Sequence, residues 1–113
     1  MLELFGTGNE SRDYINIDDL VEAIYTVASY TGDFENIINV ANGKEEKISK
    51  VAEIYAKEYG IEVENISYNG IVREGEPLNW CADISRLKSL GYVSKVDIYT
   101  GIRRYIEWVK ENC

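Results

Sequence analysis

Two arginines stand in local sequences that suit an anionic ligand. The first, Arg12, lies where a loop, residues 6–11, meets an extended stretch that begins at Tyr14. Because a guanidinium can hold a phosphate or diphosphate through two parallel hydrogen bonds, Arg12 is a candidate phosphate ligand. The plainer interpretation is an ion pair with Asp13 or another surface carboxylate, and the local sequence alone favours it.

The second arginine, Arg73, lies in a loop that contains the only proline of the chain. Gly75 would let the backbone approach a ligand closely, and Glu76 can accept hydrogen bonds from ribose hydroxyls. Trp80 follows a few residues later. The alternative is a solvated turn followed by a core tryptophan, and the local pattern leaves both interpretations open.

The sequence contains no complete catalytic set. It has no histidine, which removes the commonest general base and the commonest metal ligand. A catalytic tyrosine usually needs a lysine that lowers its pKa, and none of the nine tyrosines is followed by a lysine four positions later. The turn Gly6-Thr7-Gly8 is similar to the start of a phosphate loop, but an extended stretch follows it where a dinucleotide fingerprint requires a helix. We therefore expect no catalytic residue, no cofactor site and no metal site in this chain.

Composition narrows the class of protein. The chain has 113 residues, 45% of them hydrophobic and 28% charged, with a formal net charge of −8. These values predict one small globular domain, residues 1–113, and the acidic total argues against binding to nucleic acid or to an anionic membrane. Two cysteines do not make a secreted disulfide framework. No apolar run is long enough to span a bilayer, so we expect a cytoplasmic protein.

Short strands and helices must position these side chains. Apolar periodicity and turn residues predict the order strand, strand, helix, strand, helix, strand, loop, helix, helix. This order is typical of a small mixed α/β (α+β) domain with about four helices and too few strands for a complete doubly wound sheet. Strongly amphipathic helices also predict an exposed apolar surface, which favours self-association when unpaired. The strands are expected at 2–5, 14–17, 37–41 and 66–68, and the helices between 18 and 32, 48 and 60, 83 and 91, and from 97 onward.

The motifs of the chain, taken in order, resemble the extended short-chain dehydrogenase/reductase family. Its members include UDP-glucose 4-epimerase, dTDP-glucose dehydratase and GDP-mannose dehydratase. Each motif is modest, and their collinearity over nearly the whole chain carries the resemblance. The motifs are Gly6-x-Gly8 with Arg12-Asp13-Tyr14-Ile15 and Asp18-Asp19, then Asn39-Val40-Ala41-Asn42-Gly43, then Arg73-Glu74-Gly75-Glu76, then Ala82-Asp83-Ile84-Ser85-Arg86-Leu87 with Leu90-Gly91-Tyr92, and last Gly101-Ile102-Arg103 with Trp108.

This resemblance implies a nucleotide-sugar site. In that family the arginines that match Arg12 and Arg73 bind the nucleotide diphosphate. The residues that match Tyr14 and Glu76 line the nucleotide site, and the position of Trp80 borders the sugar nucleotide. The expected ligand is therefore a UDP-, dTDP- or GDP-linked sugar.

The family pattern also shows what this chain lacks. The family's dinucleotide fingerprint, catalytic serine or threonine and Tyr-x-x-x-Lys pair all precede the matching region. We therefore expect the C-terminal, substrate-binding third of an NAD- or NADP-dependent enzyme, inactive in isolation and completed by a missing Rossmann half. Two alternatives stay open, a stand-alone non-catalytic nucleotide-sugar binding module and a small α/β interaction domain. Val93-Ser94 stands where the family usually has a proline.

Overall fold

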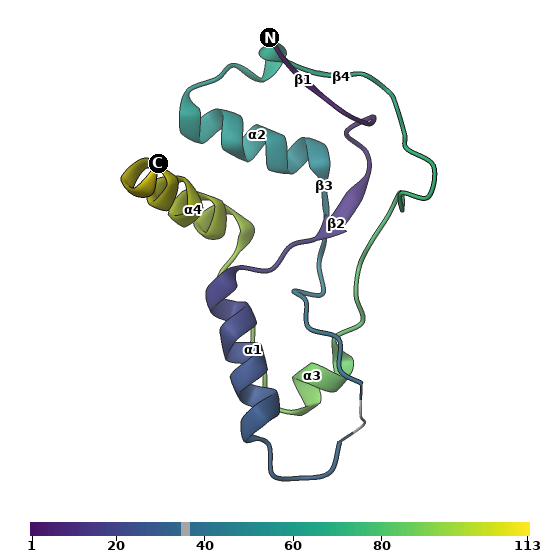
Figure 1. The fold of residues 1–113 in the computed structure, drawn as a ribbon, viewed down its shortest axis with the longest axis vertical. Helices are drawn as coiled ribbons and strands as arrows, with labels where there is room; N and C mark the ends of the chain where they lie inside the picture. Colours follow the sequence, from purple (N-terminus) through teal and green to yellow (C-terminus); the bar gives the residue numbers. More distant parts are fainter. Residues whose placement is uncertain (35–36) are drawn as a thin grey trace.

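The computed structural model describes residues 1–34 and 37–113. This described part contains four α-helices, one short 3-10 helix and four strands of three residues each, which confirms a small mixed fold with about four helices (Figure 1). In chain order the elements are β1 (Leu2–Leu4), β2 (Ser11–Asp13), α1 (Ile17–Ser29), β3 (Glu45–Lys47), α2 (Ile48–Tyr59), η1 (Val63–Asn65), β4 (Ile66–Tyr68), α3 (Ser85–Ser89) and α4 (Ile98–Asn112).

The four strands form two separate pairs. β1 pairs with β4 in parallel, and the connection between them runs through α2 (Figure 1). β2 pairs with β3 in antiparallel orientation, with Arg12 opposite Glu46. The strand expected at 66–68 is therefore confirmed with the same bounds, and the one expected at 2–5 is confirmed but ends one residue earlier, at Leu4.

Two expected strands are wrong. The stretch 14–17 is not a strand, because the side chain of Asn16 accepts a hydrogen bond from the N–H of Asp18 at 2.9 Å and caps α1, which begins at Ile17. The run 37–41 is β-branched, yet none of the described backbone hydrogen bonds joins it to a neighbouring strand. Side chains of this type favour a strand only where a neighbour supplies pairing groups.

The helix ends follow local chemistry. α1 ends at Ser29, before the expected stop at Gly32. α2 has no side-chain cap at its start and ends at Tyr59. The next residue, Gly60, has a φ of 66°, the left-handed conformation that glycine adopts at low cost. The carboxylate of Asp97 caps α4 by accepting a hydrogen bond from the N–H of Thr100 at 2.9 Å. The helix expected after Asp83 is confirmed as the short α3.

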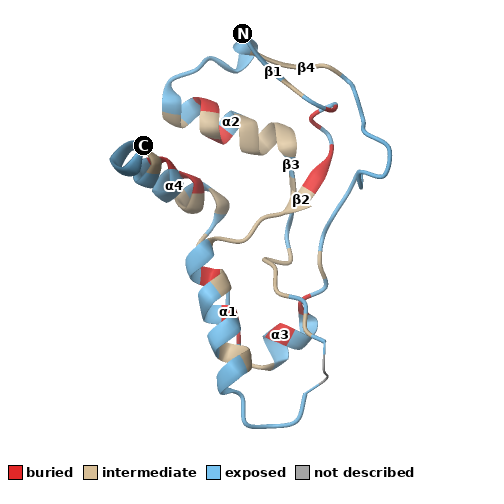
Figure 2. Ribbon diagram, in the orientation of Figure 1, coloured by how far each residue is buried: buried red, intermediate tan, exposed pale blue. Residues whose placement is uncertain are grey.

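The buried apolar residues of the described chain, Ala56 excepted, form two clusters at opposite ends of the molecule (Figure 2). One joins Ala23 of α1 to Leu87 of α3 and to Tyr92, and the other joins Ile54 of α2 to Ile106 of α4. Each cluster is small, and the two share no residue. β2 and the segments beside it connect the two ends (Figure 1).

The fold is open for its size. The radius of gyration is 16.7 Å, whereas a compact domain of this length would have about 13 Å. The accessible surface is 8057 Å², against roughly 6300 Å² for a folded monomer of this mass. Part of the excess is apolar, because one face of α1 exposes more than half of each of the side chains of Ile17, Val21, Ile24 and Tyr25. The expected exposed apolar surface is therefore confirmed. In the described part of the chain, every helix is too short or too polar to cross a membrane.

Candidate functional site

Arg12 is held at the centre of β2 by the loop that follows β4. Its Nη1 donates hydrogen bonds to the backbone carbonyls of Ser11 at 2.7 Å and Pro77 at 2.8 Å. Its Nη2 donates to Oε1 of Glu76 at 3.1 Å, and this contact is also an ion pair. The sequence left open a pairing between Arg12 and a carboxylate, and the partner is Glu76, 64 positions away. Two predicted site residues are thus in direct contact.

The loop 73–77 reaches Arg12 through a tight turn. Gly75 has a φ of 81°, a conformation that favours glycine, and the N–H of Glu76 donates to the carbonyl of Arg73 at 3.2 Å. The guanidinium of Arg73 lies 4.7 Å from the centre of the Phe5 ring, a cation–π contact. Arg73 is therefore placed by the end of β1, three residues along the loop from the partner of Arg12.

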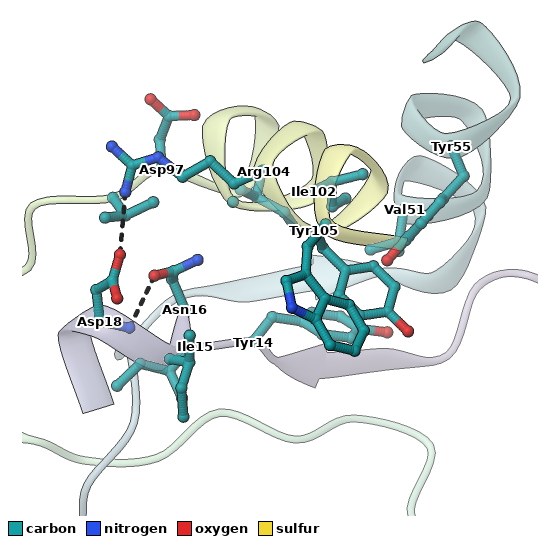
Figure 3. A pocket seen from close by; sticks show the side chains of 15 residues that line it. Tyr14, Ile15, Asn16, Asp18, Val51, Tyr55, Asp97, Ile102, Arg104 and Tyr105 are labelled. Carbon is teal, nitrogen blue, oxygen red and sulfur yellow. Dashed lines mark hydrogen bonds and ion pairs between the residues drawn. The ribbon is translucent and has the colours of Figure 1, made fainter. Parts of the chain in front are cut away.

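Tyr14 lines a cavity of about 620 Å³ between α2, α4 and the segment that leads into α1 (Figure 3). Tyr14 and Tyr105 lie at one end of this cavity, and the ion pair of Asp18 with Arg104 lies at the other (Figure 3). Burial raises the pKa of Tyr14, and the nearby charge of Arg12 opposes that rise. The tyrosine is therefore a neutral hydroxyl at neutral pH, able to donate or accept a hydrogen bond.

Trp80 lies at a different hollow, of about 540 Å³, which Asp13 also lines. The indole is 55% exposed, so it is a surface side chain and the core alternative for Trp80 is wrong. The described structure places Trp80 and Tyr14 at separate cavities and gives neither a contact with the guanidinium of Arg12.

Asp13 joins β2 to the turn at 42–43 and to Ala82, and sequence reasoning missed this role. Its Oδ1 accepts a hydrogen bond from the N–H of Asn42 at 2.8 Å, and its Oδ2 accepts from the N–H of Gly43 at 2.9 Å and of Ala82 at 3.2 Å. Gly43 has a φ of 72°, and a Cβ there would meet Ile84 at 2.8 Å, so the turn requires glycine. The turn dipeptide was visible in the sequence, but nothing in the sequence says that its N–H groups meet Asp13.

The glycine turn near the N-terminus does not fit a dinucleotide. The carboxylate of Glu10 accepts hydrogen bonds from the N–H of Thr7 at 2.9 and 3.1 Å and from its hydroxyl at 3.0 Å. These backbone hydrogen bonds lower the pKa of Glu10. A Cβ at Gly8 would lie 2.8 Å from the ring of Tyr68. The turn therefore holds the chain's own carboxylate and packs on β4. Within residues 1–34 and 37–113 no cluster of acidic or cysteine side chains could hold a metal ion.

The chain resembles known proteins along nearly its whole length. Residues 1–41 match the NAD dependent epimerase/dehydratase family. The chain is 31% identical, over 96% of its length, to a putative UDP-glucose 4-epimerase of Methanocaldococcus jannaschii and covers 34% of that protein. It is also 31% identical, over 98% of its length, to a UDP-glucuronate 4-epimerase of Thermodesulfobacterium geofontis and again covers 34%. The chain thus spans about a third of the length of these curated relatives.

Solved structures share the fold. A UDP-glucose 4-epimerase from Thermotoga maritima, solved with UDP-glucose, superposes on 97% of this chain with a TM-score of 0.84 at 25% identity, over 35% of its own length. A UDP-glucuronic acid 4-epimerase from Bacillus cereus, solved with UDP-glucuronic acid and NAD, superposes on 96% with a TM-score of 0.84 at 23% identity, also over 35% of its own length. Sequence and fold together confirm that this chain is similar to the extended short-chain dehydrogenase/reductase family, and within it to the nucleotide-sugar epimerases and dehydratases.

Proposed function

We propose that residues 1–113 form one substrate-binding domain, the nucleotide-sugar-binding portion of an NAD(P)-dependent epimerase or dehydratase. The observation that supports this most is the contact of Arg12 with the 73–77 loop. It joins a strand arginine to a loop carboxylate, and a second arginine, Arg73, stands three residues earlier in the same loop with its guanidinium on the ring of Phe5. The similarity to UDP-sugar epimerases gives this cluster a ligand of matching charge.

The diphosphate would take the place of Glu76 on the guanidinium of Arg12. The ion pair is half open to water, with 24% of the Arg12 side chain and 48% of the Glu76 side chain exposed, so it exchanges at low cost. Arg73 would add a second charge-assisted hydrogen bond from the loop. Glu76, once released, would accept hydrogen bonds from ribose hydroxyls. Tyr14 and Trp80 would border the rest of the ligand.

The cofactor would belong to a part of the enzyme other than these residues. NAD or NADP would supply hydride transfer at the sugar, and the glycine turn of this chain does not fit it, since Glu10 already fills that turn. The 113 residues also contain no Tyr-x-x-x-Lys pair. We therefore expect the chain alone to bind nucleotide sugar weakly and to turn none over. A cytoplasmic location remains a prediction.

One observation favours the alternative of an interaction domain. The accessible surface exceeds that of a compact monomer by roughly 1700 Å², and the exposed face of α1 is part of it. A missing Rossmann half that completes the enzyme would cover such a surface, and so would an unrelated partner or a second copy. A stand-alone binding module would still bind a nucleotide sugar at this site, whereas a small α/β interaction domain would not.

A titration with UDP tests the proposal. Calorimetry or NMR on the 113-residue chain should give saturable binding on the order of millimolar, because an incomplete site loses part of its contacts. Arg12→Ala and Arg73→Ala should each weaken that binding about tenfold. Arg103→Ala is the matched control, since Arg103 lies on α4 with Glu58 at 3.6 Å. An equal loss from all three variants would mean that only diffuse charge is measured.

A further inference from the structure

We infer that Asp13 is a positioning residue that sets where Trp80 lies relative to Arg12. This inference rests on the proposed function, because it concerns how the same site is assembled. The carboxylate of Asp13 accepts hydrogen bonds from three backbone N–H groups that belong to two separate segments, those of Asn42 and Gly43 and that of Ala82.

Side chains and backbone of β2 form hydrogen bonds with the segment 78–82, which follows the 73–77 loop. In a strand, alternate side chains point to opposite faces, so Ser11 and Asp13 share one face. The N–H of Ser11 donates to the carbonyl of Leu78 at 2.9 Å, and its hydroxyl lies 3.1 Å from Oδ1 of Asn79. Asp13 then holds Ala82. The segment is therefore tied down at 78, 79 and 82.

Arg12 ties down the beginning of the same segment from the opposite face of β2. It contacts Glu76 and the carbonyl of Pro77. The residues between the ties at Asn79 and Ala82 are Trp80 and Cys81, both exposed. After Trp80, the segment is held at Ala82 by the hydrogen bond from its N–H to Asp13. Loss of that tie would free the indole to move while Arg12 keeps its own contacts.

Only an aspartate satisfies all three donors. Its two oxygens accept three N–H groups, and both are needed. An asparagine has one oxygen and an NH₂ group, so at least one of the two oxygen positions would present a donor to a donor. A glutamate keeps the charge next to Arg12, but its carboxylate lies one methylene further out and cannot meet the same N–H groups without backbone movement.

Asp19 supplies a matched control elsewhere in the fold. Its carboxylate accepts from the N–H groups of Lys95 and Val96 and from the hydroxyl of Ser94. It is 2% exposed, and it ties α1 to the segment before α4 instead of to the nucleotide site. Asp19→Asn removes the same kind of contact without touching the residues on either side of Trp80.

The first experiment needs no ligand. NMR on the chain should show slow amide exchange at Gly43 and Ala82 in the wild type. Asp13→Asn should accelerate exchange at both and shift the indole N–H signal of Trp80, and Asp13→Glu should do the same. Asp19→Asn should leave the Ala82 amide and the Trp80 indole signals in place, and these two signals serve as the control because Ser94, a partner of Asp19, also contacts Asn42 beside Gly43. Rapid amide exchange at Gly43 and Ala82 in the wild type would overturn the inference. A wild-type spectrum in Asp13→Glu would overturn it as well. The wild-type measurement decides even where a variant fails to fold.

The second experiment asks whether Asp13 acts through Trp80. Asp13→Asn should weaken UDP binding about tenfold in the wild-type background and less than about twofold in a Trp80→Ala background. Equal losses in both backgrounds would mean a general structural effect and would overturn the inference. If the wild-type chain binds no UDP at all, the proposed function fails, and the exchange and indole signals alone then decide the role of Asp13.

Discussion

Asp13 and Asp19 use the same chemistry in two regions with different neighbours. Each carboxylate accepts hydrogen bonds from three donors that lie far away in the sequence. Asp19 is almost fully buried, beside the core residue Tyr92. Asp13 is only partly buried, follows Arg12 directly and lines the hollow of Trp80.

This difference separates a structural contact from a candidate binding region. A carboxylate with satisfied hydrogen bonds can by itself serve only to join segments, and both Asp13 and Asp19 join segments in this way. What distinguishes the region of Asp13 is the partly exposed Arg12 that precedes it and the exposed Trp80 that lines the same hollow. The nucleotide site is therefore proposed there and not at Asp19.

The largest expected effect is on stability at Asp19. Asp19→Asn places an amide against N–H donors in a buried position, and the free energy of unfolding should fall by about 3 kcal/mol. Urea unfolding at neutral pH measures it. The adjacent Asp18, whose side chain is 68% exposed and pairs with Arg104, is the control, and Asp18→Asn should cost less than about 1 kcal/mol. Equal costs would contradict the account of Asp19 as a buried clamp.

The loss of unfolding free energy should also differ, by a smaller amount, between alanine variants of Arg12 and of Arg104. Arg12→Ala removes an ion pair and two hydrogen bonds to carbonyls, and it should lower the free energy of unfolding by about 1–2 kcal/mol. Arg104→Ala removes an exposed ion pair with Asp18, and it should cost about 0.5 kcal/mol or less. Urea unfolding of both variants gives the comparison. A larger loss of stability for Arg104→Ala than for Arg12→Ala would contradict this prediction.

Acid should weaken the fold through Glu10, in the turn before β2. Hydrogen bonds from the backbone of Thr7 lower the folded-state pKa of Glu10 below its ordinary value of 4.5. A lowered folded-state pKa means that the stabilisation is complete above pH 4.5 and is lost as the pH falls through the lower value. Urea midpoints measured from neutral pH to below pH 4.5 should therefore fall less steeply for Glu10→Gln than for the wild type. Identical pH profiles would contradict the role given to this carboxylate.

The smallest effect is expected at Tyr92, the core neighbour of Asp19. Its hydroxyl is the one buried side-chain oxygen without a hydrogen-bond partner in the described part of the chain. Burial raises the pKa of Tyr92, the charge of Asp19 adds to that rise, and the nearby Ser94 hydroxyl opposes it without forming a hydrogen bond. Tyr92→Phe removes an unsatisfied polar atom, so the free energy of unfolding should change by less than about 0.5 kcal/mol or increase. A loss above about 1 kcal/mol in thermal unfolding would show that the hydroxyl has a partner.

Local patterns predicted the helix boundaries at which the residue type itself favours a start or an end. The stop of α2 at Gly60 and the start of α4 at Asp97 follow from the residues themselves. The run 37–41 could not be judged in this way, because a strand depends on a neighbour that the local sequence does not name. The cap of α1 is Asn16, although the neighbouring Asp18 also has a side chain that could accept hydrogen bonds at a helix start, and only the backbone path decides between them.

The site was predictable in its residue types and less so in its pairings. A carboxylate partner for Arg12 was expected from its type, but the identity of Glu76 depends on the path of a loop 64 positions away. The family resemblance named both residues. It did not indicate that Tyr14 and Trp80 line separate cavities, because the paths of the two loops that carry them are not readable from the local sequence.

The most direct test of the proposed site compares the two regions in one experiment. An amide NMR titration of the 113-residue chain with UDP reports on the surroundings of Asp13 and of Asp19 at the same time. The proposed site predicts that the largest shifts occur at residues 12–14 and 73–82, with little change at 17–29 and 92–98. Shifts spread equally over both regions, shifts confined to the surroundings of Asp19, or no saturable shifts at all would contradict a nucleotide site at Arg12.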